Sequence, residues 1–249
     1  MICCDRYGRR GPVRPSRVGI LAAAKGRLRE SAATEHVYRG TARLMHRART
    51  VYARCRFGRS YPAQFFDNLF ARNPDPWGYE GDPVSEERKA LLLDLLPTHR
   101  IPRLLEIGCA AGWMTGELAK RADAVTAVDI SPVALRLAAA RCEQWKHVQL
   151  RRLDLLTDTA AGPFDVIVCA GVLVFLPWSA QPYVRDRIVQ ALEPGGVLLL
   201  EHTRQAFPGE VAGGRIHALY AAHRELALHS RLQRNLYEAL VFQRIVSSE

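Results

Sequence analysis

Residues 104–112 read Leu104-Leu-Glu-Ile-Gly-Cys-Ala-Ala-Gly112, and this pattern predicts the fold class of the chain. Its first half is apolar except for Glu106, which is typical of a strand covered on both faces of a parallel sheet. Gly108, Ala110 and Gly112 follow at alternate positions, and such small residues let the backbone approach a ligand closely. Ligands of open α/β sheets bind beyond the carboxyl ends of the strands. We therefore expect a ligand-binding turn at this point of a parallel sheet.

Strand-like and helix-like segments alternate around this turn, which predicts a parallel sheet with covering helices. We expect strands over residues 103–107, 124–128, 148–152, 164–169 and 197–201, and helices over 62–71, 85–96, 113–121, 132–142 and 182–192. A helix around 215–223 precedes two apolar segments, 226–232 and 237–245, which indicate an antiparallel hairpin. Ser85 and Ser131 are the expected N-caps of their helices.

The positive charge of the chain is concentrated near its start. The formal net charge is +10, yet residues 1–60 hold 15 Lys or Arg against three acids, and residues 61–249 hold 20 bases against 22 acids. Nucleic-acid binding needs clustered cations, so we do not expect it of the near-neutral body. We divide the chain into a basic extension over 1–60, flexible or helical, and a folded domain over 61–249. A translation start at Met45 stays an alternative.

The six cysteines contain no CxxC pair, which favours buried reduced thiols in a cytoplasmic protein. No apolar run approaches the roughly 20 residues that span a bilayer, and the first 30 residues lack the apolar core of a signal peptide. We therefore expect a cytoplasmic protein without membrane contact, as a monomer or homodimer.

Two acids follow the next strands at positions suited to a nucleoside. Asp129 ends the second strand, where a carboxylate can accept hydrogen bonds from ribose hydroxyls. Asp154 follows the third strand and is expected to face an adenine amino group. The alternatives are that Asp129 caps the following helix and that Asp154 is an ordinary loop acid. Asp165, at the start of the fourth strand, is expected to point away from the cleft.

The turn also differs from the G-x-G-x-x-G of dinucleotide-binding proteins. A pyrophosphate would need the helix N-terminus, whereas Glu106 just before the first glycine suits a cationic ligand. S-adenosylmethionine carries a sulfonium and no pyrophosphate, so we expect it to be the cofactor.

These residues carry a family resemblance. The motifs, in chain order, are Glu106-Ile-Gly-Cys-Ala-Ala-Gly112, Val128-Asp129, Leu153-Asp154-Leu155, Phe164-Asp165-Val166-Ile167 and Leu192-Glu-Pro-Gly-Gly196. They resemble the class I S-adenosylmethionine-dependent methyltransferases. The resemblance implies a Rossmann-like α/β fold with a seven-stranded sheet in the order 3-2-1-4-5-7-6, strand 7 antiparallel, and helices on both faces. It also implies that Gly108, Ala110 and Gly112 line the methionine end of the cofactor, Asp129 the ribose and Asp154 the adenine.

A narrower resemblance lies upstream. Phe65-Phe66-Asp67 and Asn73-Pro-Asp-Pro-Trp77 resemble the nodulation protein S family of N-methyltransferases. Trp77 and Tyr79 are expected to fold over the cofactor as a lid, since aromatic faces favour a sulfonium. We expect the cofactor also to contact several neighbours of the motifs, namely Glu106, Cys109, Trp113, Ile130, Leu155 and Ala170. After the fourth strand, Ala170-Gly171-Val172 departs from the polar residue of these relatives, which leaves their acceptor amine open.

Methyl transfer is an in-line displacement in which positioning supplies most of the rate. His202 and Glu201 end the fifth strand, so we expect one of them at the mouth of the cleft as the base or as the group that orients the acceptor. The alternative is that His202 is a loop histidine without a catalytic part. His217 and His223 are too widely spaced for one helix face, and we expect no metal site.

The acceptor is expected to be a small molecule, N-methylated as an amino sugar or as a natural-product intermediate. An O-methyltransferase, an RNA or protein methyltransferase anchored by residues 1–60, a scaffold protein without activity and an NAD-dependent enzyme are the alternatives.

Overall fold

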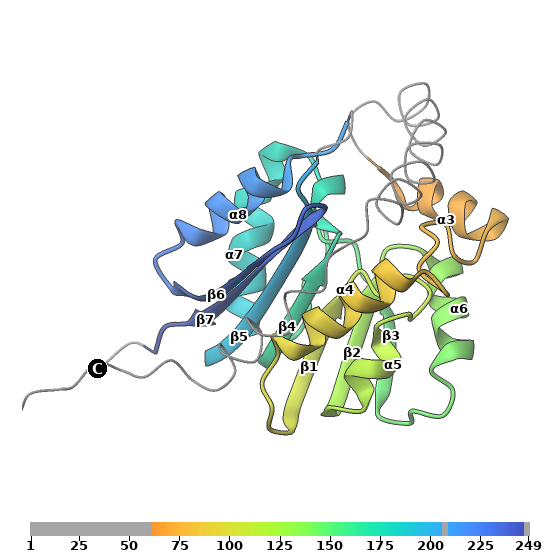
Figure 1. Cartoon of the computed structure of the whole chain (residues 1–249), viewed down its shortest axis with the longest axis horizontal. Coiled ribbons are helices and arrows are strands. Elements are labelled where there is room, and N and C mark those ends of the chain that lie inside the picture. The colour runs from red at the N-terminus through yellow and green to blue at the C-terminus, as the bar shows by residue number, and fades with distance from the viewer. Residues whose placement is uncertain (1–60, 206–208, 247–249) are drawn as a thin grey trace, which may run out of the picture.

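The computed structural model describes residues 61–205 and 209–246, where strands and helices alternate along the chain (Figure 1). The strands are β1 (Ile101–Ile107), β2 (Ala122–Asp129), β3 (Val148–Arg152), β4 (Phe164–Ala170), β5 (Leu192–Thr203), β6 (Leu226–Gln233) and β7 (Tyr237–Arg244). The α-helices are α3 (Ala63–Arg72), α4 (Pro83–Asp94), α5 (Thr115–Ala119), α6 (Pro132–Arg141), α7 (Gln181–Ala191) and α8 (Gly213–Ala221). Two short 3₁₀ turns, η1 (Leu173–Phe175) and η2 (Trp178–Ala180), follow β4. The extension expected over residues 1–60 lies outside the described residues.

The seven strands form one sheet in the order β3-β2-β1-β4-β5-β7-β6. Strands β1 to β5 pair in parallel, and β7 runs antiparallel to both β5 and β6. This confirms the expected order and the terminal hairpin. Because β1 lies at the centre between β2 and β4, the order of connections reverses there, which is where an open α/β sheet binds its ligand.

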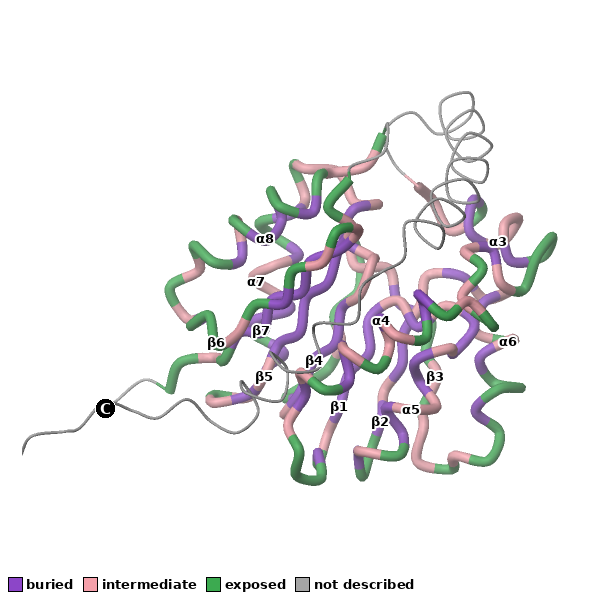
Figure 2. The backbone as a smooth tube through the Cα atoms, viewed as in Figure 1, coloured by how far each residue is buried: buried purple, intermediate pink, exposed green. Residues whose placement is uncertain are grey.

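Alternate residues of the central strands enter two apolar cores, one on each face of the sheet. Leu104 and Val166 pack with α4 and α5, while Leu105 and Ile167 pack with α7 and α8. Figure 2 shows the strands of the sheet buried between the covering helices. A third cluster, around Phe65, joins α3 to α6. Cys109, Cys142 and Cys169 are buried free thiols, as expected, whereas the other three cysteines lie outside the described residues.

Two helix starts differ in how well the sequence predicted them. Ser131 caps α6 as expected, because its hydroxyl accepts a hydrogen bond from the Ala134 N–H at 3.1 Å. The prediction that Ser85 caps α4 is wrong. The helix begins two residues earlier, at Pro83, and the Asp82 carboxylate accepts from the Ser85 N–H at 3.0 Å. Asp82 is the better cap because its carboxylate also interacts with the helix dipole.

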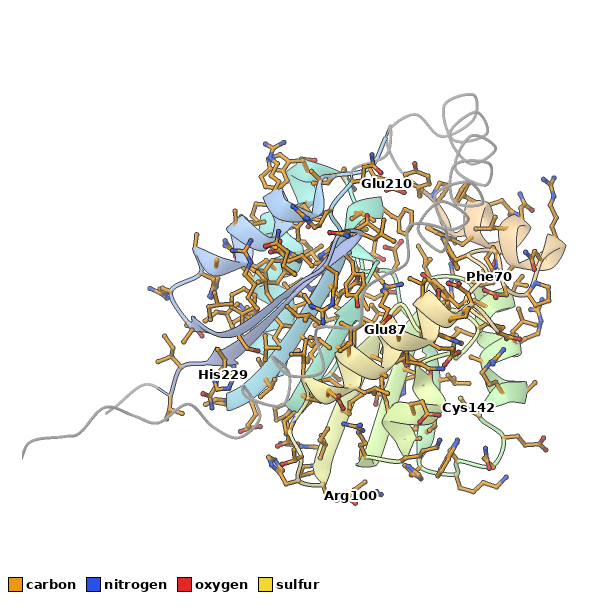
Figure 3. The ribbon with its side chains drawn as sticks, viewed as in Figure 1. Phe70, Glu87, Arg100, Cys142, Glu210 and His229 are labelled. Carbon is orange, nitrogen blue, oxygen red and sulfur yellow. The ribbon has the colours of Figure 1, made fainter. Side chains whose placement is uncertain are left out.

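The two ends of the strands carry different side chains. At the amino ends of the strands, the Arg100 side chain pairs with the Asp123 carboxylate at 2.7 Å. The Asp165 carboxylate accepts a hydrogen bond from Nε of Arg103 at 2.9 Å, so Asp165 faces away from the cleft, as expected. Phe70 of α3 lies at the opposite end from Arg100 (Figure 3). Within the described ranges, none of the helices is long and apolar enough to span a bilayer.

Candidate functional site

The turn after β1 is shaped by close contacts of its backbone. Gly108 has φ +76°, and a Cβ there would lie 2.1 Å from Cγ2 of Val172. Its N–H donates to the Val128 carbonyl of the neighbouring strand at 2.8 Å. Ala110 also has a positive φ, +50°, which is uncommon for a residue with a side chain. The backbone of the turn is therefore exposed to the space beyond the carboxyl end of β1.

Asp129 holds this turn in place. One carboxylate oxygen accepts the Ala110 N–H at 2.9 Å, and the other accepts the Ser131 N–H at 2.9 Å. Burial raises the pKa of Asp129, and the backbone hydrogen bonds oppose that rise. The alternative that Asp129 caps the following helix is wrong, because the Ser131 hydroxyl caps α6, and the Asp129 carboxylate instead orders the turn and lines the pocket.

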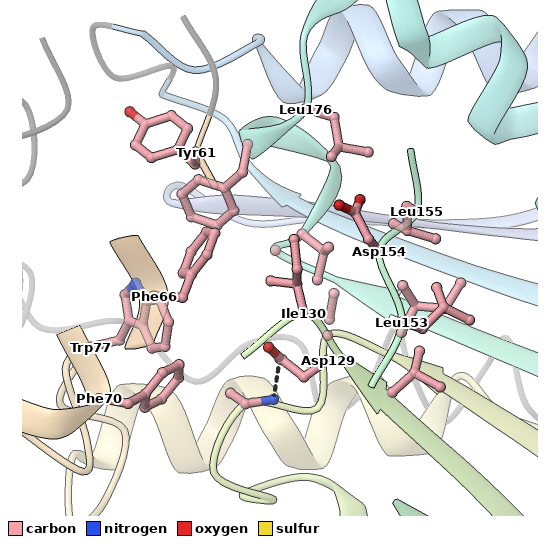
Figure 4. Close-up of a pocket in the computed structure, with 18 of the residues that line it drawn as sticks. Tyr61, Phe66, Phe70, Trp77, Asp129, Ile130, Leu153, Asp154, Leu155 and Leu176 are labelled. Atoms are coloured by element: carbon pink, nitrogen blue, oxygen red, sulfur yellow. Dashed lines mark hydrogen bonds between the residues drawn. The ribbon is translucent and has the colours of Figure 1, made fainter. Parts of the chain in front are cut away.

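A pocket of about 140 Å³ opens above these residues. Figure 4 shows aromatic side chains of α3 and the following loop on one side, and Leu153, Asp154 and Leu155 on the other, with Asp129 and Ile130 between them. Of the expected cofactor residues, the pocket brings together Trp77, Gly108, Ala110, Asp129, Ile130, Asp154, Leu155 and Ala170. The Asp154 carboxylate accepts the Leu156 N–H at 2.9 Å, which orders the loop after β3.

A smaller hollow adjoins the pocket and contains three more expected residues, Glu106, Cys109 and Trp113. Glu106 accepts a hydrogen bond from the Thr115 hydroxyl at 2.6 Å. Burial raises its pKa to about 7, and this hydrogen bond opposes the rise. A buried carboxyl of this kind is ready to lose its proton when a cation arrives. Arg88 of α4 lines the same hollow.

Gly112 lies elsewhere. It lines neither the pocket nor the hollow, and with φ +80° it faces α6, where a Cβ would lie 3.1 Å from the Ala138 Cα. The prediction that Gly112 contacts the cofactor is therefore not supported. This glycine instead allows the close approach of α6 to the turn.

Glu201 is not at the mouth of the cleft, contrary to expectation. Its side chain is fully buried and forms an ion pair with Arg88, 113 residues earlier in the chain. Its backbone carbonyl accepts the N–H of Gly171, a residue of the pocket wall, at 2.8 Å. Glu201 thus supports the pocket from behind, and its burial argues against a role as the base.

His202 is also fully buried and lines neither of these cavities. Its Nδ1 lies 3.0 Å from Nε2 of His217 on α8, and Nδ1 of His217 lies 3.2 Å from the Glu238 carboxylate. Glu238 in turn pairs with Arg231. Burial lowers the pKa of His202 well below its usual range, with a smaller contribution from His217. The expected position at the cleft mouth is wrong because the side chain points into the layer between sheet and α8.

Sequence reasoning missed the aromatic wall, by which we mean Tyr61, Phe66 and Phe175. Tyr61 meets Phe175 with ring centroids 5.3 Å apart, and Phe66 meets Phe175 at 5.3 Å, both edge to face. Phe65 packs behind at 5.2 Å from Phe66. Tyr79, expected to join Trp77 over the cofactor, does line the pocket and stacks on Trp113 at 4.7 Å. In the sequence, the adjacent pair Phe65-Phe66 indicates an aromatic cluster at α3. The residues around Phe175 give no sign that its ring contacts Tyr61 and Phe66.

Comparison with known proteins adds to this geometry. A methyltransferase domain model matches residues 104–196. Nodulation protein S of Rhizobium tropici is 33% identical over 134 residues, which are 53% of this chain and 56% of that protein. The crystal structure of the N-methyltransferase NodS from Bradyrhizobium japonicum WM9, in complex with S-adenosyl-L-homocysteine, is 30% identical with a TM-score of 0.67. That similarity covers 73% of this chain and 97% of the other.

The chain belongs to the class I S-adenosylmethionine-dependent methyltransferases. The cofactor is therefore S-adenosylmethionine, as expected from the turn and the two acids. The alignment spans little more than half of the Rhizobium tropici relative. A ubiquinone biosynthesis O-methyltransferase of Psychrobacter cryohalolentis is 30% identical over 106 residues, 39% of each chain, so relatives include both N- and O-methyltransferases.

The residues of this methyltransferase site fit the cofactor. An adenosine needs apolar walls and a carboxylate near the ribose, and the pocket supplies both. Among the described residues, no group of three or more His, Cys, Asp or Glu side chains is arranged to hold a metal ion.

Proposed function

We propose that this chain methylates a small molecule at an amine nitrogen. The observation that carries the proposal is one continuous pocket with two unlike halves. The cofactor half contains the turn and the acids, that is Gly108, Ala110, Asp129 and Asp154. The acceptor half contains the aromatic wall together with Val172 and Leu176.

The cofactor half is suited to each part of S-adenosylmethionine. Asp129 faces the ribose hydroxyls, while Ile130, Leu153 and Leu155 enclose the adenine, with Asp154 at its amino group. The buried hollow receives the amino acid end: Glu106 attracts its ammonium, and Arg88 attracts its carboxylate. Arg88 is held for this task by Glu201, so Glu201 acts as a positioning residue.

The bound cofactor supplies a methyl carbon already activated by the sulfonium. The acceptor nitrogen forms the new N–C bond as the C–S bond breaks, with the electron pair left on sulfur, and the nitrogen then releases a proton to water. The chain's residues orient the two reactants and exclude water, which is the larger part of such catalysis. Gly171 and Val172 line the pocket, and Val172 lies against Gly108 of the turn.

A nitrogen acceptor is favoured over an oxygen because of what the acceptor half contains. Its described lining has no histidine, carboxylate or lysine, so no base is at hand to deprotonate a hydroxyl. A neutral amine needs none. The similarity to nodulation protein S and to the N-methyltransferase NodS supports the same choice. The two acceptor classes expected from the sequence, an amino sugar and an amine-bearing natural-product intermediate, both carry such a nitrogen.

Calorimetry with S-adenosylhomocysteine tests the cofactor half. We expect Asp129→Ala to weaken binding roughly ten- to a hundredfold, since each charge-assisted hydrogen bond contributes about 1.5–3 kcal/mol. Asp123→Ala, an exposed acid at the far end of β2, is the matched control and should leave affinity unchanged. Equal affinity of the Asp129 variant and the parent would contradict the ribose assignment. Incubation with labelled cofactor and paired amine and hydroxyl acceptors then tests the nitrogen, and turnover of the hydroxyl compounds alone would contradict it.

The second candidate is methylation of RNA or protein with the basic residues 1–60 as anchor. Those residues lie outside the described part of the chain, and only their charge favours this reading. Deleting residues 1–44 separates the two. Loss of activity with a steep salt dependence would favour the macromolecular acceptor, whereas retained activity on small amines favours our proposal.

A further inference from the structure

The acceptor half of the pocket is lined by rings that come from two distant parts of the chain. Tyr61 lies just before α3 and Phe66 lies within it, whereas Phe175 comes from η1 after the fourth strand. The rings meet edge to face, with centroid distances of 5.3 Å for Tyr61 to Phe175 and for Phe66 to Phe175. Phe65, almost fully buried, fixes the wall from behind. The wall is thus supported by packing as well as lined by rings.

Among the residues that the structure describes, the charge of the pocket is confined to its cofactor half. Asp129 and Asp154 are the two charged residues among the described residues that line the pocket. Both accept backbone hydrogen bonds, Asp129 from the turn and Asp154 from its own loop, and the proposed function assigns them to the ribose and the adenine. The acceptor half therefore has no described ionised group with which to compensate a charge on the acceptor.

These features select against two kinds of amine. An alkyl ammonium would lose its hydration without gaining a counter-ion from the described lining, and it would also lie near the cationic sulfonium. A sugar carries several hydroxyls, each of which costs free energy to bury unless it finds a hydrogen-bond partner. Flat unsaturated rings instead meet aromatic side chains through favourable stacked or edge-to-face contacts.

We propose that the acceptor is a neutral, flat, unsaturated ring system that carries its amine directly on the ring and binds against the aromatic wall. This inference rests on the proposed methyl transfer to nitrogen and narrows its substrate class. An amine conjugated with such a ring is a weak base, so it is neutral near pH 7 and needs no group of the protein to remove a proton before attack. After transfer, the methylated nitrogen loses its proton to water.

Binding of probe amines to the full chain, saturated with S-adenosylhomocysteine, tests the inference without depending on turnover. The probes are 6-aminoquinoline, its fully saturated decahydro analogue and glucosamine. We expect 6-aminoquinoline to bind roughly tenfold or more tighter than the saturated analogue, because saturation removes the ring contacts and also leaves two aliphatic amines that are protonated near pH 7. Glucosamine should bind more weakly than 6-aminoquinoline.

Variants locate the effect in the wall. Phe175→Leu keeps an apolar side chain but removes the ring, and should weaken 6-aminoquinoline binding roughly fivefold while leaving S-adenosylhomocysteine affinity unchanged. Tyr61→Leu is a second variant from the opposite side of the wall. Tyr183→Leu, an exposed ring on α7 remote from the pocket, is the matched control and should bind all probes like the parent. Unchanged cofactor affinity shows that each variant is folded.

Equal or tighter binding of the decahydro analogue or of glucosamine would overturn the inference, and so would a Phe175→Leu variant that binds 6-aminoquinoline like the parent. The failure of the broader proposal looks different, since it is turnover of hydroxyl acceptors alone in the assay with labelled cofactor. The two outcomes are therefore read in separate experiments.

Discussion

In the cofactor half of the pocket, a single carboxylate, Asp129, holds the backbone of Ala110 and Ser131 by hydrogen bonds. In the acceptor half, Tyr61, Phe66 and Phe175 meet through ring contacts. Directional polar contacts tolerate little change, because an unpaired buried group is costly, whereas apolar contacts tolerate exchange when volume is kept. The comparison explains how one framework can keep its cofactor while different relatives use different acceptors.

The largest effect is expected at the buried ion pair beneath the cofactor half. Glu201→Gln leaves Arg88 buried without its counter-charge and should lower the free energy of unfolding by about 3–5 kcal/mol. Thermal melting would show this as a fall of about 10 °C in Tm. Glu193→Gln, which breaks a partly exposed pair with Arg103, is the control and should cost less than about 1 kcal/mol.

The double variant Arg88→Met with Glu201→Leu sharpens this prediction. Apolar replacement of both partners should recover most of the lost stability, yet cofactor affinity should stay low because the carboxylate of the ligand has lost Arg88. A Glu201→Gln protein as stable as the parent would contradict the view that the cofactor half depends on paired polar groups.

Glu106 should make stability depend on pH. Its pKa is raised to about 7 in the folded chain, so the unfolded chain ionises first as pH rises from about 4.5. The folded state then holds the extra proton, and the free energy of unfolding should fall by about 3 kcal/mol between pH 4.5 and 7 and fall no further above. Denaturant titrations at several pH values measure this. Glu106→Gln should lack that fall, and an identical profile in both proteins would rule out Glu106 as its source.

The same carboxyl should affect binding in the opposite direction. The ammonium of S-adenosylhomocysteine favours the ionised form, so affinity should rise as pH increases toward 7 and should be flat in Glu106→Gln. Calorimetry across this range checks the sign.

A smaller effect is expected at the adenine. Asp154→Ala should weaken S-adenosylhomocysteine roughly fivefold, since about one hydrogen bond of the ligand is lost. Its own bond to the Leu156 N–H lies in an exposed loop, so stability should change little. Asp123→Ala again serves as control. If Asp154→Ala lost as much affinity for S-adenosylhomocysteine as Asp129→Ala, the view that the buried carboxylate matters more for binding than the loop carboxylate would be contradicted.

The smallest effect is expected at Ala110, whose positive φ strains a residue with a Cβ. Ala110→Gly relieves about 1–2 kcal/mol of strain but adds backbone entropy to the unfolded chain, so the net gain in stability should be below about 1 kcal/mol. Ala139→Gly, in the exposed part of α6, is the control and should instead lose about 1 kcal/mol. A destabilised Ala110→Gly protein would mean that the turn is not strained.

The comparison also separates what the sequence predicts from what it does not. The cofactor half is built from the ends of strands that follow one another in the chain. Gly108, Asp129 and Asp154 could therefore be located from the local pattern and the expected sheet order, and the structure confirms that order. Gly112 lines neither cavity and instead allows the close approach of α6, a packing need that looks the same in sequence as closeness to a ligand.

The acceptor half and its supports depend on contacts between distant segments. The strand end at Glu201 and His202 resembles a cleft mouth in sequence, but Arg88 and His217 cover these side chains from helices α4 and α8. Phe175 of η1 joins the aromatic wall only because the fold brings Phe66 of α3 against it. Such pairings follow from tertiary packing and leave no periodic signal in the chain.

A crystal structure of the full chain with S-adenosylhomocysteine would test both halves of the pocket at once. We expect the ribose hydroxyls to contact the Asp129 carboxylate, the carboxylate of the ligand to contact Arg88, and the space in front of its sulfur to be bounded by Tyr61, Phe66 and Phe175. A ligand bound away from Asp129, or a sulfur that faces His202 and Glu201 in an opened cleft, would contradict this expectation.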